Sequence, residues 1–168
     1  MNPKLPELGL DYAVVCHDRD GNLLWSAEAH NLVPIEGFNH ALGVLLEGVT
    51  PITTWYVGLI ESDYTPLATV TAATLQGLAT ECLTYTPSTR VEYVGGAIAN
   101  GNNDNSANLA VFTSTADKTI YDLFLAGSPT KGSTSSVLLS VVRLPSPYPF
   151  PNGSILRVQA SPTISAPA

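Results

Sequence analysis

The stretch that most constrains the fold runs from residue 106 to residue 128 and contains two apolar runs joined by a polar segment. The runs occupy residues 109–112 and 120–126. Apolar runs that contain β-branched and aromatic residues suit the half-buried surface of a strand. Two such runs joined by a short turn form an antiparallel hairpin. The sequence therefore predicts a hairpin here, at the centre of an all-β core.

Similar apolar runs recur along the chain at short spacing, with turn-forming residues between them. They lie at residues 11–17, 23–25, 53–60, 81–86, 91–99, 137–144 and 155–159. Several short strands separated by turns are typical of an antiparallel β-sandwich or a barrel-like domain. We therefore predict a mainly β fold in one domain over residues 11–160. An extended arm at 1–10 is expected to precede it, and a tail at 161–168 to follow it.

Two details sharpen this prediction. Asp20 and Gly21 separate the first two runs and suit a tight turn, which predicts a first hairpin. Gly58 lies inside the 53–60 strand, where a glycine marks a bulge or a close approach by a neighbour.

One segment departs from the β pattern. Apolar residues at helical spacing predict one amphipathic helix over about 35–48, with Gly48 as its stop. The face expected to pack on the sheet comprises Phe38, Leu42, Leu45 and Leu46. His40 is expected on the opposite, polar side. A shorter helix is expected within 70–78, with Thr71 as its N-cap.

Residues 145–151 alternate prolines with other residues. Because proline has no backbone N–H, this segment must run along a sheet edge or across a neighbour. Its aromatic residues Tyr148 and Phe150 are expected to lack sheet pairing and to enter a pocket on another subunit. Together with Leu5 and Leu8 of the N-terminal arm, they are the predicted partner-binding residues.

Composition narrows the classes of partner. Only 12% of the 168 residues are charged, against about 25% in an average domain, and the net charge is −7. The seven basic residues are scattered singly, which argues against nucleic acid and anionic membranes as partners. No run approaches the roughly 18 apolar residues of a membrane span, and the first ten residues contain no signal-like apolar region. We expect a protein that is soluble in the cytoplasm where it is made, with a charge-poor surface suited to burial against partners; a low-charge monomer is the alternative.

The sequence contains no catalytic constellation, and we expect no catalytic residue, metal or cofactor. Cys16 and Cys82 lie in apolar runs and are expected to be buried free thiols rather than a disulfide. Cys16 and His17 are neighbours in a strand, so their side chains point to opposite faces. The alternating residues Asp18, Asp20 and Asn22 lack the glycine and glutamate positions of an EF-hand loop. A pair of carboxylates brought together from distant strands remains open.

Four segments, taken in order, resemble a family of small virion structural proteins of tailed bacteriophages. They are residues 16–46, 53–75, 104–144 and 152–165. The resemblance implies a non-enzymatic protein of the particle, and the preferred role is a head decoration, or cement, protein on the outer capsid surface. Its implied partners are the major capsid protein and further copies of itself, as a trimer or dimer. The N-terminal arm and residues 145–151 depart from the resemblance, so contacts there are expected to be particular to this chain.

Two other classes of function remain open. One is a tail or baseplate component that binds a host receptor or glycan, which exposed aromatic residues at loop tips would support. The other is a hydrolase whose residues converge only in the fold.

Overall fold

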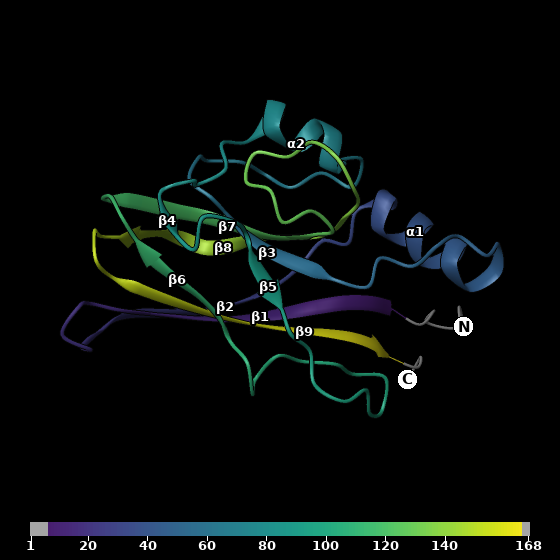
Figure 1. The fold of residues 1–168 in the computed structure, drawn as a ribbon, viewed down its shortest axis with the longest axis horizontal. Helices are drawn as coiled ribbons and strands as arrows, with labels where there is room; N and C mark the ends of the chain where they lie inside the picture. Colours follow the sequence, from purple (N-terminus) through teal and green to yellow (C-terminus); the bar gives the residue numbers. More distant parts are fainter. Residues whose placement is uncertain (1–6, 166–168) are drawn as a thin grey trace, which may run out of the picture.

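The computed structural model describes residues 7–165 and contains two antiparallel sheets and two helices within that range (Figure 1). The strands are β1 (Glu7–His17), β2 (Leu23–His30), β3 (Trp55–Ile60), β4 (Tyr85–Thr86), β5 (Val91–Tyr93), β6 (Ala110–Ser114), β7 (Lys118–Ala126), β8 (Leu138–Phe150) and β9 (Ile155–Ser165). The helices are α1 (Ile35–Leu46) and α2 (Ala72–Leu78). The predicted mainly β, sandwich-like fold is confirmed.

The first sheet has the strand order β2-β1-β9-β6-β4, and the second has the order β5-β3-β7-β8. The larger hydrophobic cluster draws residues from both sheets, including Tyr12, Phe112 and Phe150. A smaller cluster forms around Phe124, together with Leu75 of α2. In Figure 1, α2 lies beyond the second sheet, on the side away from the first sheet.

The first predicted hairpin is confirmed, because β1 pairs with β2 across residues 18–22. Asp18 holds the turn, since its Oδ1 accepts hydrogen bonds from the backbone N–H groups of Asp20 and Asn22 at 2.9 and 2.8 Å. Gly21 takes the positive φ of 88° that glycine adopts without strain.

The β1 strand begins earlier than predicted, and β9 ends later. Residues 7–10 pair with residues 162–165, so the described part of the expected arm and tail belongs to the first sheet. Leu8, for example, lies opposite Ile164. Residues 1–6 and 166–168 lie outside the described residues.

The predicted central hairpin at 106–128 is wrong. Its two strands, β6 and β7, belong to different sheets: β6 pairs with β4 and β9, whereas β7 pairs with β3 and β8. The connecting residues bond to other strands, since the Thr115 N–H donates to Thr84 O and the Ser114 N–H to Ser154 O. Both apolar runs therefore face one core from opposite layers, whereas a hairpin would bury the same runs side by side in one sheet.

Gly58 allows the close approach that its position in β3 predicted. It lies opposite Phe124 of β7, whose ring occupies the space that a Cβ at Gly58 would need. The ring of Phe124 therefore packs directly against the β3 backbone.

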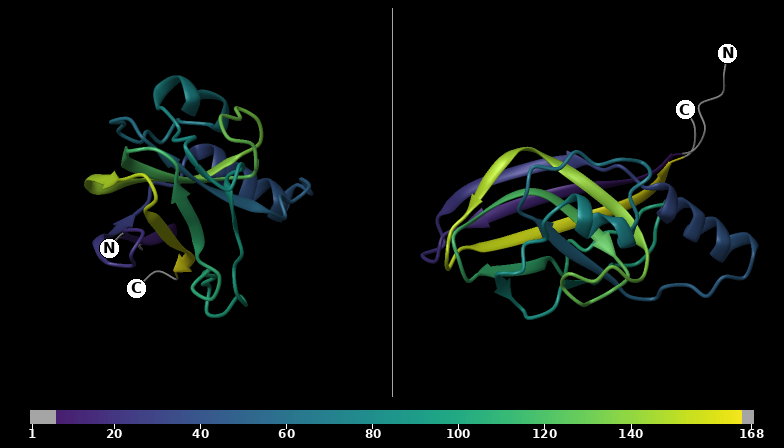
Figure 2. Two further views of the ribbon diagram at one scale, coloured as in Figure 1. Left: turned by 60° about the vertical axis from the view of Figure 1, so that its left-hand side comes forward. Right: turned by 90° about the horizontal axis from the view of Figure 1, so that it is seen from above.

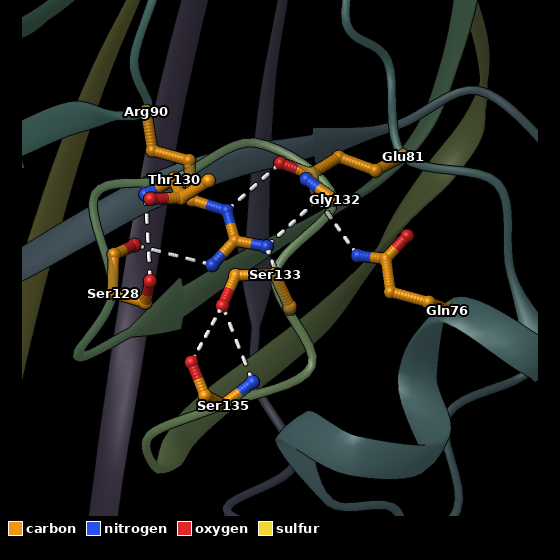
Figure 3. Close-up of polar contacts among 8 residues, drawn as sticks. All are labelled: Gln76, Glu81, Arg90, Ser128, Thr130, Gly132, Ser133 and Ser135. Atoms are coloured by element: carbon orange, nitrogen blue, oxygen red, sulfur yellow. Dashed lines mark hydrogen bonds and ion pairs between the residues drawn. The ribbon is translucent and has the colours of Figure 1, made fainter.

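A buried ion pair fastens the loop between β7 and β8 to the rest of the molecule (Figure 3). Arg90 and Glu81 are each 2% exposed, and Arg90 Nε and Nη2 donate to the two Glu81 carboxylate oxygens at 2.8 Å. Arg90 Nη1 also donates to Ser128 O, and the Gly132 N–H donates to Glu81 Oε2 at 2.9 Å. Gln76 of α2 donates to the same oxygen at 2.7 Å. The pair thus joins α2, the segment after it and the β7–β8 loop.

Candidate interaction surface

Helix α1 is where the structure departs most from the expected packing. The helix itself is confirmed, and Gly48 follows it with a φ of 70°, as expected of a helix stop. The orientation is wrong: the buried residues of α1 are Gly37 and Gly43, and the large aliphatic residues face outward.

Gly37 lets α1 lie directly against the backbone of β8, whereas Gly43 is covered by the side chain of Val49. A Cβ at Gly37 would lie 2.8 Å from the carbonyl oxygen of Leu139, closer than a side chain can approach. Glu36 adds a polar attachment, because its Oε2 accepts hydrogen bonds from the N–H groups of Ala72 and Leu138, both at 2.8 Å. The helix is therefore held on the sheet by the close contact of its backbone with β8 and by the hydrogen bonds of the Glu36 carboxylate.

The outward side of this segment forms what we call the α1 apolar face. Its members are Ile35, Phe38, Leu42, Leu45 and Leu46. Each is at least 41% exposed, and Leu45 and Leu46 reach 75% and 77%. Isolated exposed aliphatic residues are ordinary, but a contiguous group marks a contact surface.

The α1 apolar face lies at one end of the molecule. In Figures 1 and 2, α1 projects beyond the body of the sandwich, at the end where β1 begins and β9 finishes. Residues 35–49 contain two charged residues, Glu36 and Glu47, and no lysine or arginine. Since Glu36 is engaged within the fold, the surface offers apolar contact with almost no charge.

His40 lies on the attached side of α1 and is half-buried, which corrects its expected polar-side position. Its ring meets Trp55 edge-on, with ring centroids 5.9 Å apart. The spacing of apolar residues correctly predicts the helix and its apolar stripe. The side of the helix that packs on the sheet is the one that contains the glycines, opposite that stripe.

The predicted anchors Tyr148 and Phe150 belong to β8, which is an edge strand, as the prolines required. They do not lack sheet pairing: Tyr148 lies opposite Ile120 and Phe150 opposite Lys118. Phe150 is fully buried, so its predicted role as an exposed anchor is wrong. Its side chain fills the core between the sheets, where burial of an aromatic ring is most favourable.

Tyr148 is half-buried and attaches β8 to β2. Its ring stacks on Trp25 with centroids 4.4 Å apart, and Trp25 Nε1 donates to Pro149 O at 2.7 Å. Leu8 is half-buried against the main core, and Leu5 lies outside the described residues. The structure therefore does not gather the predicted partner-binding residues into one exposed patch within residues 7–165.

The histidines and cysteines lie apart. His17 lies near Arg157, His30 pairs with Asp11 at 2.7 Å, and His40 contacts Trp55. Cys16 and Cys82 are free and buried, as predicted. Burial raises the pKa of both thiols, which disfavours the thiolate that a nucleophile needs.

One carboxylate has an unusual environment. Asp122 of β7 is fully buried, and neither of its oxygens has a hydrogen-bond partner among the described residues. Burial raises its pKa to about 7; Arg143 opposes this rise, and Asp63 adds to it. Arg143 Nη2 donates to Asp63 at 2.6 Å, and its Nη1 donates to Tyr64 O and Thr65 Oγ1, which fixes the segment after β3. Because Asp122 is fully buried, a substrate cannot reach its carboxyl group from the surface. We therefore treat it as a core residue whose ionisation affects stability.

No helix within residues 7–165 has the length and apolar character to cross a bilayer. In the same part of the chain, no three His, Cys, Asp or Glu side chains lie together as metal ligands. A scan against protein-family models finds no match, and a search of curated proteins finds no significant relative.

Proposed function

We propose that this chain is a non-enzymatic structural protein of a tailed bacteriophage particle, and that it decorates the outer head by docking the α1 apolar face onto the major capsid protein. The observation that carries the proposal is the outward orientation of Leu45, Leu46 and their neighbours. The resemblance of the sequence to small virion proteins supports the choice of particle.

The α1 apolar face suits a partner that supplies an apolar groove. A helix normally gains stability by burying its apolar stripe against its own core. In α1 that stripe is exposed, and it presents hydrophobic residues at positions 35, 38, 42, 45 and 46. This spacing is the one by which an amphipathic helix occupies a groove on another protein.

The location of the α1 apolar face suits binding to a repeated lattice. Because α1 projects from one end, it can be covered while the body of the sandwich remains in solvent. A capsid presents many equivalent sites, and linked copies of a decorating protein bind such a lattice far more tightly than a single copy. Self-association as a dimer or trimer would provide that linkage.

The test is occupancy on particles that lack the protein. A Leu45→Ser/Leu46→Ser variant should reduce bound copies at least about tenfold, because apolar area leaves the contact, whereas its free energy of unfolding should change by about 0.5 kcal/mol or less per exposed site. The matched control is Leu78→Ser/Leu83→Ser, since these leucines are 50% and 51% exposed elsewhere on the surface. Occupancy is measured by co-sedimentation.

Electron microscopy of whole virions then locates the bound chain. Density in many copies on the outer head, with α1 against a capsomer, is the expected result. Density confined to the tail tip would contradict the proposal and favour the receptor-binding class. Full occupancy by the Leu45→Ser/Leu46→Ser variant would assign the contact to another surface.

A further inference from the structure

A hollow adjoins the first turn of α1, beside the N-terminal end of the α1 apolar face. Its volume is about 380 Å³, and its surface is mostly apolar. It lies between α1 and the segment before α2, and its lining residues are Ile35, Glu36, Asn39, Thr69 and Thr71. Because Ile35 belongs to both the hollow and the α1 apolar face, the two form one continuous surface.

Hydrogen bonds and core packing fix the walls of this hollow. The Ile35 N–H donates to Ala68 O at 2.9 Å, which joins the start of α1 to the segment before α2. Glu36 Oε2 accepts from the Ala72 N–H at 2.8 Å. Val70 anchors the same segment, since it is 1% exposed within the smaller hydrophobic cluster. A hollow that is already formed binds a side chain without the cost of ordering its walls.

The lining of the hollow combines apolar surface with polar groups that are free to bond. Within residues 7–165, no hydrogen bond engages Glu36 Oε1, the Asn39 amide or the Thr69 hydroxyl. Glu36 Oε1 and the Asn39 carbonyl can each accept a hydrogen bond from an O–H or N–H group. An aliphatic side chain in the hollow would cover these acceptors without supplying a donor, which is unfavourable. An aromatic ring with a donor at its edge satisfies both the apolar surface and the acceptors.

We infer that the hollow receives a tyrosine or tryptophan side chain of the major capsid protein when the α1 apolar face docks. Aromatic side chains of this kind often anchor protein interfaces, where they fill a pocket and weaker contacts surround them. The α1 apolar face supplies the surrounding contact here, and the hollow fixes the register of the partner along α1. This inference rests on the proposed function and adds the chemistry of the partner's anchoring residue.

The first test uses the free full chain, so its result does not depend on a capsid. p-Cresol, which has the structure of a tyrosine side chain, is titrated into the protein while NMR records the amide chemical shifts. We expect saturable shifts at Ile35, Asn39 and Thr69, with a dissociation constant of about 10 mM or tighter. Toluene lacks the hydroxyl group and should bind at least about threefold more weakly.

The second test fills the hollow with a side chain of the protein itself. Thr69→Trp does so from the segment before α2 and leaves the α1 apolar face unchanged. It should abolish the p-cresol shifts and reduce the number of copies bound to particles at least about fivefold. Asn39→Trp fills the hollow from α1 and should repeat both effects. The matched control is Thr134→Trp, at an exposed threonine of the β7–β8 loop, which should behave as wild type.

The outcomes separate this inference from the proposed function. Loss of occupancy in Leu45→Ser/Leu46→Ser with full occupancy in Thr69→Trp and Asn39→Trp would overturn the inference and leave the capsid docking in place. Full occupancy in all three variants would contradict the docking, and the inference with it. Absence of p-cresol shifts at the hollow, or equal binding of toluene, would overturn the inference whatever the occupancy.

Discussion

The two helices of this protein use their apolar residues in opposite ways. In α2, Ala72 and Leu75 are 5% and 3% exposed and belong to the cluster around Phe124. In α1, the glycines are buried and the leucines face solvent. The comparison shows that α2 serves the fold, whereas α1 carries a surface that the fold does not use.

The helix termini follow the same division. Thr71 caps α2 with a reciprocal pair of bonds, since its Oγ1 accepts from the Thr74 N–H and its own N–H donates to Thr74 Oγ1. Such a capping box satisfies backbone donors that a short helix would otherwise leave unpaired. The N-cap position of α1 is Pro34, which makes no side-chain capping bond. Local sequence thus stabilises the seven-residue helix more than the twelve-residue one.

The largest predicted effect comes from removing the buried ion pair between Arg90 and Glu81, to which Gln76 of α2 is also bonded. Arg90→Leu leaves Glu81 buried without its cation, which should lower the free energy of unfolding by about 3–5 kcal/mol. Urea denaturation measures the loss, and Arg19→Leu, at an exposed arginine, is the control with an expected change of about 0.5 kcal/mol or less. A loss under about 1 kcal/mol for Arg90→Leu would mean that the ion pair does not hold this layer together.

The next prediction compares one leucine from each helix. Leu75→Ala removes buried side-chain atoms beside Phe124 and should cost about 2–4 kcal/mol. Leu45→Ala, at a side chain that is 75% exposed, should change stability by about 0.5 kcal/mol or less. Equal losses in thermal or urea unfolding would contradict the division between the helices.

A third prediction concerns the pH dependence of stability that arises from Asp122, the buried carboxylate of β7. An aspartate in an unfolded chain titrates near pH 3.9, whereas the pKa of Asp122 is raised to about 7 by burial. Between these values the folded state binds more protons at Asp122, so the contribution of Asp122 to stability should be fully present below about pH 4 and be lost as pH rises through about 7. The expected loss between pH 5 and pH 8 is on the order of 2 kcal/mol.

Asp122→Asn should remove this loss, because the amide does not ionise. Urea unfolding of both proteins at pH 5 and pH 8 measures the difference. Asp20→Asn, in the exposed turn of the first hairpin, should retain the wild-type pH dependence. A wild-type stability that is flat from pH 5 to pH 8 would show that Asp122 gains a partner when it ionises.

The smallest predicted effects have opposite signs in the two helices. Gly37→Ala introduces a Cβ 2.8 Å from Leu139 O and should cost about 1–2 kcal/mol by pushing α1 away from β8. Gly77→Ala in α2 meets no atom within 4 Å and should stabilise by about 0.5–1 kcal/mol through helix propensity. Thermal unfolding resolves both shifts, and a Gly37→Ala variant as stable as wild type would show that the glycine contact does not position α1.

Features governed by neighbouring residues were predictable from the sequence. The turn at Gly21, the cap at Thr71, the edge position of the prolines and the burial of Cys16 and Cys82 each follow from local chemistry or from an apolar run. The helical spacing at residues 35–48 likewise identified α1, because spacing reflects the geometry of one element.

The choices between alternative partners required the tertiary structure. The runs that form β6 and β7 are equally compatible with a hairpin and with strands in opposite sheets, because both arrangements bury the same side chains. The sequence is compatible with Phe150 as an anchor or as a core residue, and only the pairing of β8 with β7, which places Phe150 in the main cluster, decides between them. The outward orientation of the α1 leucines depends on Gly37, rather than a leucine, meeting β8. This is decided by a backbone 102 residues further along the chain, where the Leu138 N–H donates to Glu36. Sequence by itself determined the elements and their apolar residues; the tertiary structure decided which of those residues face a partner, because packing between distant segments leaves no local pattern.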